Sequence, residues 1–180
     1  MDWDAIYRSE KDYKYLSSAD LNFMLKQIKI ENGNSALDIG CGTGQLSRDL
    51  FHKGFSVLGI DISKEAIKIA KSSTVKLDDG IDFQLQDIEN DQKLTDRYDL
   101  IVSKYVLAFI KNKKSFLGKV KKLMNKNSVL IIISPNIGSQ PDNKKFIALD
   151  NSVTLKLLNQ CFNAVNYCHR NNDDYYFCTL

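Results

Sequence analysis

Three glycines at alternate positions, Gly40, Gly42 and Gly44, follow a short apolar segment at residues 36–39. The apolar segment predicts a buried strand, and the residues after the glycines predict a helix. A glycine turn between a strand and a helix lets the backbone approach a ligand closely, because no Cβ stands in the way. The unpaired N–H groups and the positive dipole at the start of a helix favour a carboxylate or another anion. We therefore expect a ligand-binding site at this turn.

The spacing of these glycines distinguishes between two kinds of nucleotide-like ligand. In the dinucleotide-binding fingerprint G-x-G-x-x-G the third glycine comes one residue later, and Gln45 stands at that place here. The pattern G-x-G-x-G, with the acid Asp38 two residues before it, resembles motif I of the class I S-adenosylmethionine-dependent methyltransferases. This resemblance implies that S-adenosylmethionine binds along the turn. The residues implied in its binding are Asp38, Gly40, Cys41, Gly42, Gly44 and Gln45.

A second acid, Asp61, ends the next apolar segment, at residues 55–60. An acid at the end of this strand accepts hydrogen bonds from ribose hydroxyls and repels a 2′-phosphate, which argues against NADP. NAD-dependent enzymes also carry an acid there, so Asp61 alone indicates a ribose and not which one. The alternative is that Asp61 only precedes the next helix, which Ser63 and Lys64 begin.

Two further strand ends contribute to the same expected site. Asp87 follows the third apolar segment, and the resemblance implies that it binds the adenine amino group while Ile88 and Ile62 pack on the ring. Taken alone, Asp87 is equally typical of a cap in the turn after a strand. Ser103 ends the fourth segment, in a region similar to motif IV of the family, and the resemblance places it beside the methyl donor.

The chemistry that the resemblance implies needs no obvious acid–base pair. The methyl group of S-adenosylmethionine is already activated, so the protein has to align the nucleophile with the departing sulfur. A general base is needed only when the nucleophile is protonated at working pH. The sequence therefore identifies no catalytic residue, and the candidates are Lys104 and Tyr105 after the fourth strand and His169 near the end of the chain.

Strands and helices alternate along the chain and predict how these residues are positioned. Strands are expected at residues 36–39, 55–60, 81–86, 98–103 and 128–134, and helices at 44–53, 64–71, 113–124 and 153–162. This order predicts an α/β fold with a parallel sheet and right-handed crossovers. Segments 164–169 and 175–179, separated by polar residues 170–174, predict a terminal antiparallel hairpin. The resemblance implies a Rossmann-like three-layer sandwich with a mostly parallel seven-stranded sheet that ends in this hairpin.

The length of 180 residues fits one domain over residues 1–180. Within it we expect a donor-binding core at 35–180, preceded by a helical lid segment at 1–34. Either Ser18 or Asp20 is the expected N-cap of a helix in that segment.

Aromatic residues concentrate in the expected lid. They suit a small organic substrate, or a tyrosine hydroxyl that holds the carboxylate of the donor. The alternative is that they only pack the segment onto the core. The loop after the fourth strand and residues 135–151 would complete the cover of the site. The aromatic residues meant are Trp3, Tyr7, Tyr13 and Tyr15.

The composition is that of an ordinary globular protein, with a formal net charge of +3. No apolar run approaches the length of a membrane span, and the first residues do not resemble a secretory signal. The four cysteines lack the spacing of a metal site, so we expect free thiols, no metal and a cytoplasmic location. A disulfide between Cys168 and Cys178 is the less favoured alternative. The four are Cys41, Cys161, Cys168 and Cys178.

Lysines concentrate between residues 104 and 126. They fit the solvated face of an amphipathic helix, and the scarcity of arginine argues against a nucleic-acid contact. The first hypothesis is therefore a methyltransferase that acts on a small-molecule substrate. The alternatives are an RNA or protein methyltransferase that uses the 104–126 face, a non-catalytic relative that binds the donor, and a nicotinamide-dependent oxidoreductase, which Gln45 disfavours. The sequence predicts no oligomeric state.

Overall fold

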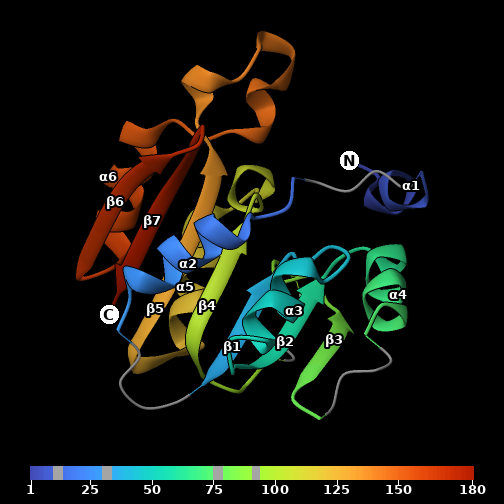
Figure 1. Cartoon of the computed structure of the whole chain (residues 1–180). Coiled ribbons are helices and arrows are strands. Elements are labelled where there is room, and N and C mark those ends of the chain that lie inside the picture. Colours follow the sequence, from blue (N-terminus) through green and yellow to red (C-terminus); the bar gives the residue numbers. More distant parts are fainter. Residues whose placement is uncertain (10–13, 30–33, 75–78, 91–93) are drawn as a thin grey trace.

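Seven strands form one sheet in the order β3-β2-β1-β4-β5-β7-β6 (Figure 1). The structure is a computed structural model, and it describes residues 1–9, 14–29, 34–74, 79–90 and 94–180. The first five strands in this order, β3, β2, β1, β4 and β5, are parallel to one another. Strand β7 runs antiparallel to both β5 and β6. This arrangement confirms the predicted mostly parallel α/β sheet with a terminal hairpin. The strands are β1 (Ser35–Ile39), β2 (Ser56–Asp61), β3 (Ile81–Leu85), β4 (Tyr98–Lys104), β5 (Met124–Pro135), β6 (Ala164–Arg170) and β7 (Asp173–Thr179).

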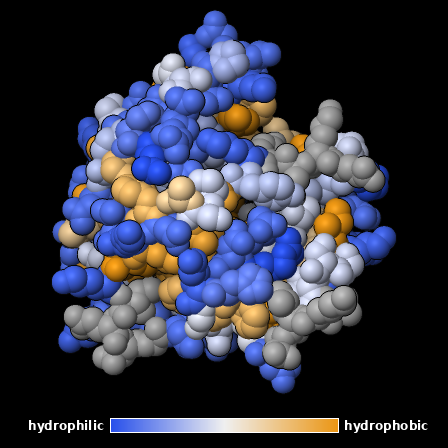
Figure 2. Space-filling model, viewed as in Figure 1, coloured by the Kyte–Doolittle hydropathy of each residue, from blue (hydrophilic) through white to orange (hydrophobic). Residues whose placement is uncertain are grey.

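Helices cover both faces of the sheet, as in a three-layer sandwich (Figure 1). On one face lie α2 (Ser18–Lys26), α3 (Gln45–Phe51) and α4 (Lys64–Ser72), and on the other lie α5 (Lys113–Lys122) and α6 (Asn151–Cys161). The short helix α1 (Trp3–Arg8) packs against α4. The outer side of α2 and α3 is mostly hydrophilic (Figure 2). Three short 3₁₀ helices are η1 (Leu107–Phe109), η2 (Ile137–Ser139) and η3 (Asp142–Ile147).

The central strands are apolar throughout because the sheet is buried on both faces. In β4, Ile101 packs with the α5 side of the core, whereas Leu100 and Val102 pack with the α2 side. In β5, Ile132 and Ile131 divide between the two sides in the same way. Each such fully buried side chain stabilises the fold by about 1.5–3 kcal/mol relative to an exposed one.

The terminal hairpin has a shorter turn than the sequence predicts. Asn171 and Asn172 form the whole turn, with φ of 52° and 68°. Two successive residues with positive φ are typical of a two-residue type I′ turn, in which asparagine is favoured. Asp173 and Asp174 therefore belong to β7, where both are buried, rather than to a five-residue loop.

Several predicted boundaries move by a few residues. Helix α5 ends at Lys122, and Met124 already begins β5, because its buried side chain joins the core as strand. Helix α2 is capped by Ser17, which accepts a hydrogen bond from the Asp20 amide, rather than by Ser18 or Asp20. Part of the predicted 1–34 segment, including Tyr13, lies outside the described residues.

Two glycines offer a matched test of the packing between β2 and α3. A Cβ on Gly59 would lie 2.7 Å from the Phe83 ring and 2.9 Å from Ser47 Oγ, whereas a Cβ on Gly118 in α5 would meet nothing within 4 Å. We expect Gly59→Ala to lower the free energy of unfolding by about 1–3 kcal/mol through overpacking. Gly118→Ala should raise it by about 0.5–1 kcal/mol, because alanine favours the helix. Urea denaturation measures both, and equal effects would contradict the packing described here.

Candidate active site

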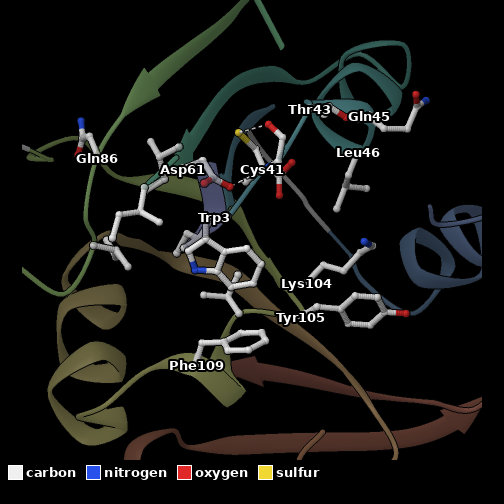
Figure 3. Close-up of a pocket in the computed structure, with 18 of the residues that line it drawn as sticks. Trp3, Cys41, Thr43, Gln45, Leu46, Asp61, Gln86, Lys104, Tyr105 and Phe109 are labelled. Atoms are coloured by element: carbon white, nitrogen blue, oxygen red, sulfur yellow. Dashed lines mark hydrogen bonds between the residues drawn. The ribbon is translucent and has the colours of Figure 1, made fainter. Parts of the chain in front are cut away.

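A cavity of about 180 Å³ lies at the carboxyl ends of β1, β2, β3 and β4. This is the edge at which open α/β sheets bind ligands. Residues from α1, the segment before α2 and η1 form its other walls. Figure 3 shows Gln86 and Lys104 at opposite ends, with Trp3 between Asp61 and Phe109. The lining residues are Trp3, Tyr7, Tyr15, Leu16, Asp38, Ile39, Gly40, Cys41, Gly42, Thr43, Gln45, Leu46, Ile60, Asp61, Ile62, Gln86, Asp87, Ile88, Glu89, Lys104, Tyr105, Val106, Phe109 and Ile110.

The glycine loop between β1 and α3 forms the floor of the cavity. Gly40 and Gly42 have φ of 70° and 55°, a backbone conformation that disfavours side chains. A Cβ on Gly40 would lie 2.2 Å from Val106 Cγ2, and one on Gly42 would lie 2.8 Å from the Tyr7 hydroxyl. Both positions therefore require glycine for their backbone and for the close approach of neighbouring segments.

Three residues that the sequence predicts at the site do not line the cavity. Gly44, with φ of 82°, is the N-cap of α3, and a Cβ there would meet the Phe83 ring at 2.7 Å. Ser103 is fully buried within β4, and its hydroxyl has no hydrogen-bond partner among the described residues. His169 lies on the edge strand β6, where Nδ1 is 2.9 Å from a carboxylate oxygen of Asp174. Gly44 thus shapes the loop, whereas Ser103 and His169 belong to other surroundings.

Asp61, at the end of β2, holds the glycine loop through its carboxylate. One oxygen accepts the Gly42 N–H at 2.9 Å, and the other accepts the Ser63 N–H at 2.8 Å. Burial raises the pKa of Asp61, although these backbone hydrogen bonds oppose the shift. Since each carboxylate oxygen can accept a second hydrogen bond, Asp61 can still bind hydroxyl groups in the cavity.

Asp38, at the end of β1, is a second buried acid in the wall. Burial raises its pKa to about 6, although the hydrogen bond from Ser47 Oγ at 2.6 Å and the positive charge of Lys104 both lower it. The nearby charge of Asp61 raises it further. Two carboxylates of this kind on neighbouring strands favour a ligand that brings hydroxyl groups or positive charge.

The far end of the cavity is lined by residues after β2 and β3. Asp87 accepts hydrogen bonds from the Glu89 N–H at 2.9 Å and the Asn90 side chain at 2.7 Å, so it caps this turn as well as lining the cavity. Ile62, which is 53% exposed, and Ile88 line the same end. An exposed isoleucine beside a cavity is suited to packing against a flat apolar ligand.

Trp3 and Tyr7 of α1, with Tyr15 and Leu16 before α2, form the roof of the cavity. Asp4 in α1 accepts the Ser63 hydroxyl at 2.6 Å and the Glu65 N–H at 3.2 Å at the start of α4. On the opposite wall, Trp3 meets Phe109 of η1 edge to face, with ring centroids 4.9 Å apart. Helix α1 therefore bridges two sides of the cavity.

The second half of the roof is attached to the terminal hairpin. Asp20 of α2 accepts hydrogen bonds from Arg170 Nε at 2.5 Å and from the Asn171 side chain at 2.8 Å. Lys14 forms an ion pair with Asp173 at 3.0 Å. These contacts place Tyr15 and Leu16 in the wall of the cavity.

Lys104 and Tyr105, two of the predicted catalytic candidates, line the cavity. Tyr105 has a φ of 60°, and its hydroxyl donates to Asp173 at 2.8 Å. In Figure 3 this hydroxyl points away from Trp3 and Phe109. Burial, together with the charge of Asp173, raises the pKa of Tyr105 well above its ordinary value. Tyr105 is therefore suited to support the wall and not to accept a proton.

The sequence predicts that the loop after the fourth strand covers the site, but it does not identify which residues of that loop form the apolar wall beside the glycine loop. Val106, Phe109 and Ile110 follow β4 in an apolar run that could have been assigned to the cavity by its place at a strand end. No sequence pattern marks four other wall residues, because contacts with segments distant in sequence determine where they lie. These residues are Thr43, Leu46, Gln86 and Glu89.

The lysine-rich face is partly engaged in the fold. Lys113 donates to the Ile110 carbonyl, Lys119 to the Glu89 carbonyl and Lys121 to the Cys161 carbonyl. Several of its charges therefore stabilise loop and helix ends around α5.

The described residues also bear on the predictions about a metal site, a disulfide and a membrane span. No group of His, Cys, Asp and Glu side chains there could hold a metal ion, and no described helix has both the length and the apolar character of a membrane span. All four cysteines are free. Cys168 pairs with Tyr175 and Cys178 with Val165, so the two do not face each other across the hairpin.

Comparison with known proteins identifies relatives of this chain. The sequence model of a family described as a methyltransferase domain matches residues 30–176. A putative methyltransferase, 235L, of Invertebrate iridescent virus 6 is 34% identical over 130 residues, which cover 71% of this chain and 46% of that protein. A ubiquinone biosynthesis O-methyltransferase of Pelagibacter ubique is 34% identical over 128 residues, which cover 70% and 48%. The chain thus spans about half the length of these curated relatives.

Solved structures share the fold. A SAM dependent methyltransferase from Aquifex aeolicus has a TM-score of 0.75 at 15% identity, covering 99% of this chain and 98% of that one. The plantazolicin methyltransferase BpumL, in complex with a monoazolic desmethylPZN analog and SAH, has a TM-score of 0.70 at 18% identity, covering 83% and 77%. At these identities the likeness establishes the Rossmann-like α/β fold alone.

Asp38 should make stability depend on pH. Its raised pKa means that the folded state favours the neutral acid. The stability that the neutral carboxyl contributes is therefore fully present below about pH 3.8 and is lost as the pH rises through about 6. Asp38→Asn removes the charge and can still accept from Ser47. We expect the variant to be more stable than the parent at pH 8, by up to about 3 kcal/mol. Near pH 4 the difference should disappear.

Urea denaturation at the two pH values measures this effect. Asp142→Asn, at a side chain that is 93% exposed, is the control and should show no such difference. A gain from Asp38→Asn that is the same at pH 4 and pH 8 would contradict the assignment of the buried charge.

Proposed function

The chain belongs to the family of methyltransferase domains, and on this premise we propose that it transfers a methyl group from S-adenosylmethionine to a small-molecule acceptor. The observation that carries the proposal is the meeting of the glycine loop, Asp38 and Asp61 at one floor of a cavity at the carboxyl edge of the sheet. The matched segment covers only about half of each curated relative, so the activity and the acceptor are our proposal for this chain.

The residues of the cavity fit the donor. Asp61 would accept the ribose hydroxyls with the hydrogen-bonding capacity that Gly42 and Ser63 leave. Ile62 and Ile88 would pack on the adenine, beside Asp87. At the other end, the glycine loop leaves room for the amino-acid tail because no Cβ extends from Gly40 or Gly42.

When bound, the donor supplies a methyl group on a sulfonium, which needs no activation by an acid. The task of the chain is therefore to orient the acceptor and to exclude water, and such positioning supplies about 7–11 kcal/mol of barrier reduction. Trp3, Tyr7 and Phe109 close the cavity for this purpose. We propose that the acceptor atom is an oxygen, which the name of the Pelagibacter ubique relative supports.

A small acceptor is favoured over RNA or a protein. The cavity is covered by the chain's own aromatic residues, and lysines of the 104–126 face are hydrogen-bonded to backbone carbonyls. With four free cysteines, a cytoplasmic location fits the same proposal.

Ligand binding tests the proposal directly. S-adenosylhomocysteine should raise the melting temperature, whereas NAD and NADP should not, because Gln45 departs from the dinucleotide-binding fingerprint and Asp61 also repels the 2′-phosphate of NADP. Gly42→Val and Asp61→Ala should each lower the affinity for S-adenosylhomocysteine by about tenfold or more, as measured by calorimetry. The first substitution forces a side chain against Tyr7, and the second removes the group that accepts the ribose hydroxyls. Asp142→Ala is the control. Unchanged affinity in both variants would overturn the site.

The single tryptophan of the chain provides a second readout. Trp3 lies in the cavity wall, so S-adenosylhomocysteine should cover part of its indole and shift the fluorescence emission to shorter wavelength. The titration midpoint should agree with the calorimetric Kd. An emission that stays constant while calorimetry reports binding would contradict the role of α1 as roof.

A further inference from the structure

The outer side of β6 is the free border of the sheet next to the terminal hairpin. The strand order ends at β6, which lies outermost in Figure 1 and pairs, among the described strands, with β7 alone. Its seven residues, Ala164–Arg170, keep one continuous register with β7. A regular edge of this kind offers a row of N–H and C=O groups to another strand.

The geometry of the hairpin determines which backbone groups of β6 face outward. In a two-residue hairpin the residues that flank the turn form a hydrogen-bonded pair, and the two kinds of pair then alternate along the strands. Arg170 and Asp173 flank the turn, so every second residue of β6, counted from Arg170, turns its backbone toward β7. Val165, Tyr167 and His169 therefore direct their N–H and C=O groups outward. Within the described part of the chain no backbone group meets them.

Strand β6 lacks the features by which proteins usually block the edge of a sheet. Such features are lysine or proline on the edge, a bulge, or a very short strand. The opposite edge strand, β3, has five residues and carries the charged Asp82. In contrast, β6 has neither lysine nor proline, and its arginine, Arg170, stands at its end. The edge of β6 is thus the one suited to a partner strand.

Two side chains next to the outward groups are held in fixed positions. Tyr167, which is 38% exposed, donates its hydroxyl to Asp174 at 2.9 Å, and its ring centroid lies 5.5 Å from that of Tyr176. His169 Nδ1 is also 2.9 Å from the fully buried carboxylate of Asp174. Because these side chains are already ordered, packing a partner strand against them costs little side-chain entropy.

A second copy of β6 matches this edge when it runs antiparallel about a two-fold axis at Tyr167. Val165 then faces His169 of the second copy, and the two Tyr167 residues face each other. These are the residues whose backbone groups point outward, so the pairing forms about six hydrogen bonds between the strands. The Tyr167 rings meet at the axis, where an aromatic pair across two strands is favourable.

The remaining residues of β6 are compatible with the same pairing. Asn166 faces Cys168 of the second copy, and Arg170 faces Ala164. No two like charges therefore lie opposite each other, although such a pair would be destabilising. The edge is in this sense complementary to itself.

We propose that the chain forms a symmetric dimer in which β6 pairs antiparallel with β6 of a second copy, with Tyr167 at the two-fold axis. One pair of short strands buries less surface than the roughly 1,200–2,000 Å² of a stable interface. The dimer is therefore reversible, with a Kd of roughly 10 μM.

Sedimentation equilibrium of the full chain measures this association. Tyr167→Lys places two ammonium groups opposite each other at the axis and should raise the dissociation constant at least about tenfold. Tyr167→Phe is the matched control, because it also removes the hydrogen bond to Asp174 but adds no charge, and it should dimerise like the parent. A parent chain that stays monomeric at about 200 μM, or a Tyr167→Lys chain that dimerises as the parent does, would overturn the proposal.

Cysteine crosslinking tests the register of the two strands. Asn166→Cys places a thiol opposite Cys168 of the second copy, and oxidised glutathione should convert these two thiols into a disulfide that joins the copies. Asn166→Cys combined with Cys168→Ala should give no such product, nor should Asp142→Cys, at a side chain that is 93% exposed.

Two outcomes of the crosslinking contradict the pairing. Asp142→Cys that crosslinks as strongly as Asn166→Cys would show random collision, and a parent chain that links through Cys168 itself would exclude the axis at Tyr167. Far-UV circular dichroism of each variant verifies that the fold is retained.

Discussion

The buried carboxylate of Asp61 joins the parts of the site that come from different elements. It accepts the N–H of Gly42 from the loop after β1 and the N–H of Ser63 from the start of α4. The Ser63 hydroxyl in turn donates to Asp4 of α1. Because floor and roof are attached within two residues of Asp61, a change at this side chain affects the loop, the helix and the cover of the cavity together.

Two buried acids in one site are unfavourable for stability. Burial raises the pKa of both Asp38 and Asp61, so their ionised forms are less stable in the fold than in water. The backbone N–H groups at Asp61 and the charge of Lys104 near Asp38 offset only part of this penalty. Perturbed acids in a cavity are typical of binding and catalytic sites.

The sequence predicts those features that depend on neighbours along the chain. The alternation of strands and helices is a local pattern, and it predicts a mostly parallel sheet and the order of the elements along the chain. The glycine loop and Asp61 were found because each lies at a strand end. Contacts between distant residues leave no such pattern: Asp4 meets Ser63, and Asp20 meets Arg170 across 150 positions. The roof and the buried position of Asp173 and Asp174 therefore emerge only in three dimensions.

The cavity depends on both ends of the chain. Lys14 and Asp20, before the first strand, bind Asp173 and the turn at Arg170 and Asn171, between the last two strands. Asp173 also holds the Tyr105 ring on which Lys104 rests. The donor end of the site is therefore complete only when the terminal hairpin has paired with β5.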